Sequence, residues 1–311
     1  MTKKIININL ANPRGFCAGV VRAIEIVEKS IEKYGPPIYV RHEVVHNKFV
    51  IENLKKKGAI FTDNIDEIPM NSHVIFSAHG VSKKIREESK QYQLKPIDAT
   101  CPLVTKVHNE VNHYLNNDYE IIMIGHKGHP EVEGTLGQEA ESAKMFLVEN
   151  ESDIKKIKVK NKDKLAYVTQ TTLSLDETRN IISKLITVFP NIKGPKADDI
   201  CYATQNRQDA VNNQLDKAEL LIVVGSNNSS NSNRLKELGD KKNIESYLVD
   251  SPKSIKSEWF NNKKEVLLTG GASAPEELIK SIIERIASLT NIKINEFNGV
   301  KENIIFKLPK I

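Results

Sequence analysis

The sequence predicts an α/β fold made of three similar units, and three observations lead to this prediction. Apolar strand-like runs alternate with helical patterns along most of the 311 residues, which favours mainly parallel sheets joined by right-handed crossovers. Each third of the chain has one turn that carries a cysteine and two other polar turns. The intervals between these turns also repeat. Such a loose internal period indicates three units around a pseudo-threefold axis, which is a trefoil.

The cysteine turns and the polar turns keep a regular spacing. Each cysteine follows an apolar run and a tight turn and precedes an amphipathic helix; the three are Cys17, Cys101 and Cys201. The first polar turn follows its cysteine by 29, 28 and 28 residues, at His46, His129 and Ser229. The second follows by 62, 70 and 72 residues, at His79, Thr171 and Ser273. Because ligands of open α/β sheets bind beyond the carboxyl ends of the strands, we expect these turns to converge on one cavity with the thiols at its floor.

The predicted elements can be followed in chain order. A strand at 4–11 precedes the first cysteine turn, and we expect it to pair with the third unit. Two strand-turn-helix segments then follow in each unit, at 37–54 and 74–89, at 120–136 and 165–182, and at 220–238 and 265–283. The units are bounded at 19–100, 101–197 and 198–286, and residues 1–18 complete the third. For residues 287–311 we expect an extended C-terminal tail, because the segment NEFNGVKENIIFKLPKI has no helical period.

Composition narrows the class of protein. An odd number of widely separated cysteines argues against a secreted disulfide framework and for a reducing compartment. No apolar stretch reaches the roughly 18 to 20 residues of a membrane span, and the N-terminus lacks the apolar region of a secretory signal, so we expect no membrane association. The formal net charge is +5, but the 45 basic residues are scattered. Since nucleic-acid surfaces cluster such residues, we expect no nucleic-acid partner.

Three cysteines in equivalent turns indicate one shared metal site, although a lone cysteine is more often a small buried hydrophobic residue. Structural zinc favours close C-x-x-C pairs, which the sequence lacks. A Cys3His zinc site stays open, because histidines are available. Three thiols around a 4Fe-4S cluster would leave one iron open for water or substrate. Spacing favours iron-sulfur over zinc and leaves both open.

The polar turns are typical of a site for phosphate groups. Imidazoles, hydroxyls, amides and backbone N–H groups at helix starts suit phosphate oxygens, with ordinary helix caps and polar loops as the alternative. Neither GSNNSSNSNR nor GGASAP is a Walker motif, because no Gly-Lys-Ser/Thr follows. The candidate anion-binding residues are His46, His79, His129, Ser229, Ser230, Asn231 and Ser273.

Glu131 in GHPEVEG stands out as an acid among neutral donors. It either adds favourable charge to the first turn of a helix or delivers a proton, since desolvation and a nearby phosphate would raise its pKa. Thr171 and Thr172 in VTQTTLS could orient this acid or a substrate hydroxyl, or cap a helix. We favour proton delivery by Glu131 through Thr171, with Thr172 nearby.

Nine motifs in this order closely resemble the bacterial-type 4-hydroxy-3-methylbut-2-enyl diphosphate reductases of the non-mevalonate isoprenoid pathway. The motifs are NPRGFCAGV, VRHEVVHN, SAHGVS, DATCPLVTKVH, GHPEVEG, TQTTLS, DDICYAT, GSNNSSNSNR and GASAP. They span nearly the whole chain, and an ordered set of nine is far more specific than any one of them. No site position departs from the family pattern.

The resemblance implies a trefoil around an oxygen-sensitive 4Fe-4S cluster that Cys17, Cys101 and Cys201 bind, with one open iron. It implies an enzyme that removes the C4 hydroxyl of an allylic diphosphate with two electrons and two protons, giving isopentenyl and dimethylallyl diphosphate. Glu131 and Thr171 would be the catalytic residues. Thr171 and Thr172 would also bind the substrate, together with the anion-binding residues named above.

Electrons have to come from outside the chain, because the sequence has no nicotinamide or flavin fingerprint such as G-x-G-x-x-G. The resemblance implies a ferredoxin or flavodoxin type of donor. It also implies the cytoplasm of a bacterium or the stroma of a plastid-type organelle, and the Lys, Asn and Ile bias favours an apicoplast. The alternatives are an iron-sulfur sensor, which needs no organised diphosphate site, and a nucleic-acid-binding protein, which needs a contiguous basic surface.

Overall fold

The structure is a computed structural model that describes residues 5–139 and 144–311. Packing divides the described chain into two compact bodies. The first body contains the residues up to Val21, His46–Asn53 and Tyr202–Ile305, and the second contains Arg22–Val45, Leu54–Cys201 and Phe306–Ile311.

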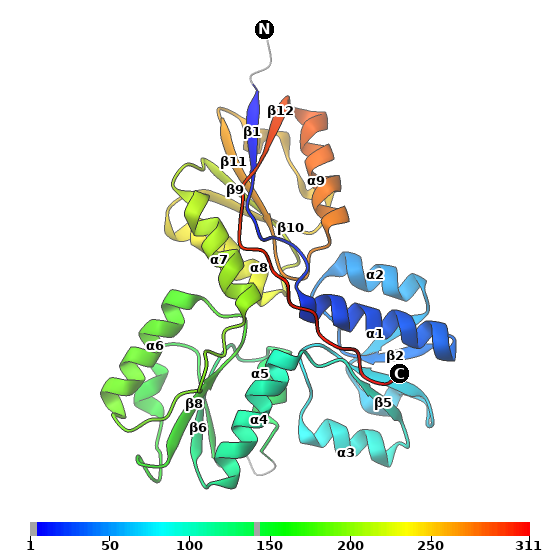
Figure 1. The fold of residues 1–311 in the computed structure, drawn as a ribbon, viewed down its shortest axis with the longest axis vertical. Coiled ribbons are helices and arrows are strands. Elements are labelled where there is room, and N and C mark those ends of the chain that lie inside the picture. Colours follow the sequence, from blue (N-terminus) through cyan, green and yellow to red (C-terminus); the bar gives the residue numbers. More distant parts are fainter. Residues whose placement is uncertain (1–4, 140–143) are drawn as a thin grey trace. The chain divides into compact units, whose positions relative to one another are not determined.

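A five-stranded parallel sheet is the frame of the first body (Figure 1). Its strand order is β10-β9-β11-β1-β12, so the strand before the first cysteine turn lies between two strands from the end of the chain. The expected pairing of this strand with the third unit is therefore confirmed. The strands are β1 (Ile6–Leu10), β9 (Leu220–Val224), β10 (Glu245–Val249), β11 (Glu265–Gly270) and β12 (Ile292–Glu296). The helices are α7 (Tyr202–Leu215), α8 (Ser230–Lys241) and α9 (Glu276–Leu289), with short 3-10 helices η3 (Pro252–Ser254) and η4 (Ser257–Phe260).

Strand β9 shows why helices cover both faces of this sheet. All five of its residues are buried, and successive side chains of a strand point to opposite faces. Ile222 belongs to one core cluster together with Ile282 of α9. Leu221 belongs to another, together with Val211 of α7 and Leu235 of α8. The continuous apolar run of this strand is thus explained by burial on both sides.

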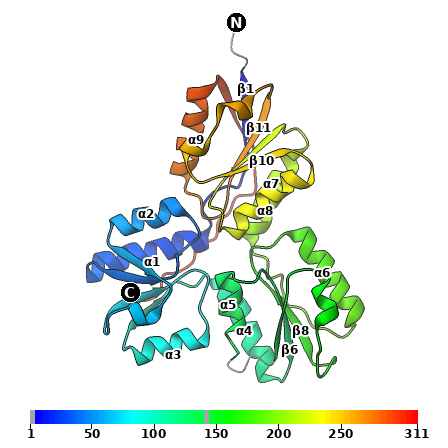
Figure 2. The ribbon, with the colours of Figure 1, turned by 180° about the vertical axis from the view of Figure 1, so that it is seen from behind.

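The second body contains two parallel sheets, with strand orders β3-β2-β4-β5 and β7-β6-β8. Figure 2 shows α4 and α6 on opposite sides of the three-stranded sheet. The strands are β2 (Ile38–Arg41), β3 (Ala59–Thr62), β4 (His73–Phe76), β5 (Lys95–Asp98), β6 (Glu120–Ile124), β7 (Met145–Val148) and β8 (Leu165–Thr169). The helices are α3 (Lys83–Gln91), α4 (Pro102–Asn116), α5 (Pro130–Leu136) and α6 (Leu175–Val188), with short 3-10 helices η1 (Ile65–Glu67) and η2 (Asp153–Lys156). Helices α1 (Ala18–Tyr34) and α2 (Lys48–Lys56) have residues in both bodies.

The predicted α/β class with mainly parallel strands is confirmed. The unit boundaries 19–100, 101–197 and 198–286 stay a prediction, because packing groups the described chain differently. No helix in the described ranges is both long and apolar enough to cross a membrane.

The predicted tail at 287–311 needs a correction at its start. Helix α9 continues to Leu289 and β12 begins at Ile292, so the segment without helix or strand starts only after Glu296, apart from the two residues between α9 and β12. The sequence does not predict β12, because this partly exposed edge strand has only two apolar residues among five.

Candidate active site

The Cys17 turn in the first body is fixed by backbone hydrogen bonds. The N–H of Gly15 donates to the carbonyl of Gly270 at 3.0 Å, and the N–H of Cys17 donates to that of Ala272 at 3.1 Å. Gly15 has a φ of 71°, and a Cβ there would lie 3.0 Å from the carbonyl oxygen of Ala274. The turn therefore favours glycine. It presents a partly exposed thiol directly before α1.

Cys101 and Cys201 in the second body have a similar local structure. The N–H of Cys101 donates to the carbonyl of Ala78 at 2.9 Å, and that of Cys201 to the carbonyl of Thr171 at 3.0 Å. Each cysteine directly precedes a helix. All three thiols are partly exposed and outside disulfides. This donor set fits a metal or an iron-sulfur cluster, because thiols at helix starts are favourable ligands.

Glu131 is a buried acid that Thr171 contacts on both carboxyl oxygens. Its side chain lies in α5 and is 3% exposed. The N–H of Thr171 donates to Oε1 at 2.6 Å, and the hydroxyl donates to Oε2 at 3.0 Å. Burial raises the pKa of Glu131 from 4.5 to about 7, although both bonds from Thr171 act in the opposite direction. A carboxyl group with such a pKa can exchange a proton near neutral pH.

The predicted imidazoles His79 and His129 lie next to each other in the second body. Their ring centroids are 5.7 Å apart and their planes nearly perpendicular. His129 caps α5, since its Nδ1 accepts the N–H of Glu131 at 3.2 Å. The ring of His79 also contacts the ring of His42, and the centroids of these two rings are 6.0 Å apart. Two candidate anion-binding residues thus adjoin the helix that carries the acid.

The turn after His79 depends on a histidine that sequence reasoning missed. Gly80 has a φ of 78°, and a Cβ there would lie 2.7 Å from Cε1 of His108 in α4. Burial lowers the pKa of His108 to about 4, so this ring is neutral at neutral pH. His108 therefore supports the His79 turn by packing. Its place on the buried face of a helix gives no sequence signal for this contact.

Thr172 is connected to a second missed residue, Gln170. The side-chain amide of Gln170 donates to the hydroxyl of Thr172 at 3.0 Å and accepts the N–H of His126 at 3.1 Å. Gln170 is buried directly after β8. It links two of the predicted polar turns of the second unit.

In the first body, two predicted turns meet at His46. The hydroxyl of Ser273 donates to the His46 carbonyl at 2.8 Å. The side-chain nitrogen of Asn228 lies 3.3 Å from Nδ1 of the same histidine. Sequence reasoning missed Asn228, although it belongs to the polar run GSNNSSNSNR. Ser273 and Asn228 thus both contact His46.

The remaining predicted residues of the first body lie at the start of α8. Ser229 caps this helix through its hydroxyl oxygen, which is the alternative that the sequence left open. Asn231 accepts the N–H of Ala272 at 2.8 Å and donates to the hydroxyl of Thr204 at 3.3 Å. Ser230, the first residue of α8, is buried beside them. Asn231 therefore also supports the loop that accepts the Cys17 N–H.

Comparison with known proteins gives consistent matches over nearly the whole chain. The LytB protein family matches residues 8–287. The 4-hydroxy-3-methylbut-2-enyl diphosphate reductase of Vibrio parahaemolyticus serotype O3:K6 is 57% identical over 309 residues, which are 98% of each chain. That of Aliivibrio fischeri strain MJ11 is 56% identical over 306 residues, again 98% of each.

Solved structures agree with these matches. The E-1-hydroxy-2-methyl-but-2-enyl-4-diphosphate reductase from Plasmodium falciparum has a TM-score of 0.91 at 40% identity, covering 98% of this chain and 96% of its own. A structure of (E)-4-hydroxy-3-methyl-but-2-enyl diphosphate reductase, described as the terminal enzyme of the non-mevalonate pathway, has a TM-score of 0.63 at 30% identity. It covers 91% of this chain and 100% of its own.

Proposed function

Since the chain belongs to the LytB protein family, we propose that it reduces (E)-4-hydroxy-3-methylbut-2-enyl diphosphate in the last step of the non-mevalonate pathway. The C4 hydroxyl leaves as water, and two electrons and two protons are consumed. The products are isopentenyl and dimethylallyl diphosphate, depending on which allylic carbon receives the second proton. The names of relatives at 56 to 57% identity over nearly the full chain support this reaction.

The buried Glu131 with Thr171 on both its oxygens is the observation that carries the proposal. Loss of a hydroxyl group needs a proton, since hydroxide is a poor leaving group. A pKa of about 7 leaves a large fraction of Glu131 protonated at neutral pH. We assign the proton to Oε2. In the protonated acid, the Thr171 hydroxyl would accept this proton and donate its own to the leaving oxygen. Thr172 lies next to this relay and would contact the substrate.

The three thiols would hold the cofactor that such a reduction needs. When bound through Cys17, Cys101 and Cys201, a 4Fe-4S cluster supplies electrons and, at its iron without a cysteine ligand, Lewis acidity. Partly exposed thiols outside disulfides support this assignment. We propose that the trefoil expected from the sequence brings the three cysteine turns to this one cluster.

The diphosphate would bind to hydrogen-bond donors that satisfy its oxygens. Imidazoles, hydroxyls and helix N-termini supply such donors. The assigned residues are His46, His79, His129, Ser229, Ser230, Asn231 and Ser273.

A ferredoxin or flavodoxin type of protein would deliver the electrons one at a time. The bacterial origin of the relatives named above favours a bacterial cytoplasm over an apicoplast for this reaction. Reduction of the purified enzyme by a reduced flavodoxin would test the donor class.

Anaerobic purification followed by iron and sulfide analysis tests the cofactor, and turnover of the allylic diphosphate with a chemical reductant tests the reaction. We expect iron and sulfide in cluster stoichiometry and formation of both products. Stoichiometric zinc without iron contradicts the cofactor. An intact cluster that turns over no substrate contradicts the enzyme and favours the sensor alternative.

A further inference from the structure

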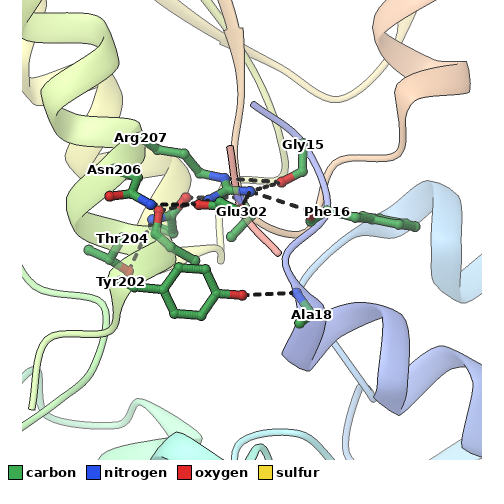
Figure 3. Close-up of polar contacts among 11 residues, drawn as sticks. Gly15, Phe16, Ala18, Tyr202, Thr204, Asn206, Arg207 and Glu302 are labelled. Carbon is green, nitrogen blue, oxygen red and sulfur yellow. Dashed lines mark hydrogen bonds and ion pairs between the residues drawn. The ribbon is translucent and has the colours of Figure 1, made fainter. Parts of the chain in front are cut away.

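The buried Arg207 connects the C-terminal segment of the chain to the Cys17 turn within the first body (Figure 3). Arg207 lies in α7 and its side chain is fully buried. It makes a two-pronged ion pair with Glu302, in which Nη1 lies 3.0 Å from Oε1 and Nη2 lies 3.2 Å from Oε2. Asn206 donates to the same Oε1 at 3.0 Å. A paired fork of this kind fixes the orientation of the guanidinium group.

The other N–H groups of Arg207 hold main-chain carbonyls. Nε and Nη2 donate to the Gly15 carbonyl at 3.0 and 2.8 Å, and Nη2 also lies 3.4 Å from the Phe16 carbonyl. Nη1 donates to the carbonyl of Ala203 at 2.8 Å. With the two bonds to Glu302, all five N–H groups of the guanidinium have acceptors. Three of these contacts hold the carbonyls of Gly15 and Phe16, the two residues before Cys17.

A separate bond reaches the residue after Cys17. The hydroxyl of Tyr202 accepts the N–H of Ala18 at 3.3 Å (Figure 3). Tyr202 itself directly follows Cys201 in the sequence. The start of α7 thus contacts the Cys17 turn both before and after the thiol.

Stability alone is a weak explanation for this arrangement. Burying a guanidinium and a carboxylate costs desolvation, and well-packed apolar residues often replace such pairs without loss of stability. An apolar residue cannot hold the Gly15 and Phe16 carbonyls, however. The N–H groups of Gly15 and Cys17 are bonded to Gly270 and Ala272, so the turn is held through its N–H groups and through its carbonyls at once.

We propose that Arg207 and Glu302 are positioning residues for the Cys17 thiol, so that the C-terminal segment is a working part of the cluster site. Arg207 holds the backbone of the turn, and Glu302 keeps the guanidinium in place and balances its charge. This inference rests on the proposed function, because it assumes that Cys17 binds a cluster. Without Glu302, a buried positive charge would remain uncompensated and the fork would lose its fixed orientation.

Two variants separate positioning from stability. Glu302→Gln keeps the shape and removes the charge, while the double variant Arg207→Met with Glu302→Leu replaces the pair by apolar groups of similar size. We expect both to lose iron to a chelator roughly 10- to 100-fold faster than the wild type under anaerobic conditions, as for other residues that orient metal ligands. The electron paramagnetic resonance spectrum of the reduced cluster should also change. Glu302→Asp should recover part of the retention.

Matched controls make the result decisive. Asp240→Asn removes a carboxylate from a surface ion pair with Lys236 in the same body and should leave iron release and the spectrum unchanged. Circular dichroism checks that each variant is folded. If Glu302→Gln is not folded, the double variant decides the inference. If the wild type contains a cluster but the variants keep the same iron retention and the same spectrum, the inference is wrong and the proposed function still stands. A wild-type protein without iron and sulfide overturns the proposed function as well.

Discussion

Glu131 combines deep burial with a hydrogen-bond donor on each carboxyl oxygen. Its role can be tested by replacing the carboxyl group with an amide. Glu131→Gln keeps the shape but cannot deliver a proton. We expect turnover to fall by about 10²- to 10⁴-fold, with iron content unchanged, in an assay with a chemical reductant. The control is Glu133→Gln, because Glu133 lies in the same helix but is exposed. Equal turnover in the two variants removes Glu131 from the proton path.

The raised pKa of Glu131 also predicts how stability depends on pH. Its pKa is 4.5 ordinarily and about 7 in the folded protein, so between these values the folded state holds a proton that the unfolded state has released. The stabilisation is complete below pH 4.5 and is lost as the pH rises through 7, on the order of 3 kcal/mol in all.

Urea unfolding at pH 5 and pH 8 measures this effect as a difference between the wild type and Glu131→Gln. Relative to the variant, the wild type should be less stable at pH 8 than at pH 5. Parallel pH profiles for the two proteins contradict a buried, titrating Glu131.

The Thr171 hydroxyl predicts a shift in the pH profile of turnover. Thr171→Val removes one of two donors that favour the carboxylate, so the pKa of Glu131 should rise further above its present value of about 7. The alkaline limb of the turnover profile should move to higher pH while the maximal rate falls, because the relay is lost. Thr171→Ser should restore the position of the alkaline limb and the maximal rate. An unchanged pH profile in Thr171→Val contradicts a role of the Thr171 hydroxyl in setting the pKa of Glu131.

At the scale of elements, Ser229 has a structural role as the cap of α8 and a proposed role as a diphosphate donor. Ser229→Ala should cost about 1 kcal/mol of unfolding free energy through the lost cap, and should raise the KM for the allylic diphosphate several-fold. Ser82→Ala is the matched control, since Ser82 caps α3 in the same way. It should lose similar stability by urea unfolding with no change in KM. Identical kinetics in both variants leave Ser229 as a cap alone.

Local sequence patterns predict β1 and the strands, turns and helices of the six strand-turn-helix segments, because each depends on neighbouring residues. Strands β3, β7, β10 and β12 lie outside these segments. The contact between Glu131 and Thr171 joins residues 40 apart in the sequence. It is predicted because both residues belong to polar turns that follow strands and are expected to converge. Arg207 and Glu302 could not be predicted as partners, since they are far apart in sequence and neither lies in a conspicuous motif. Gln170 and His108 were missed for a related reason, because buried polar contacts are specified by packing and leave no periodic signal.

At the scale of the whole molecule, the proposed ligands belong to both compact bodies, with Cys17 in the first and Cys101 and Cys201 in the second. A cofactor that binds only the native state stabilises it. Anaerobic removal of iron with a chelator should therefore lower the thermal midpoint, by roughly 2 to 4 °C for each kcal/mol lost. In Cys101→Ser, where assembly is impaired, the chelator should have little effect. Equal midpoints with and without iron in the wild type contradict stabilisation of the native state by the proposed cofactor.

The pairing of β1 with β11 and β12 determines when the five-stranded sheet can form during synthesis. Among the described strands, β1 comes first in the sequence, and its two neighbours, β11 and β12, come after all the others. Until then its edges stay unpaired, and such nonlocal strand pairing is slow and prone to aggregation. The second body, whose two sheets use only strands from β2 to β8, can form co-translationally. Nascent chains stalled before β11 should consequently protect the second body from protease and leave the N-terminal strand open to chaperones.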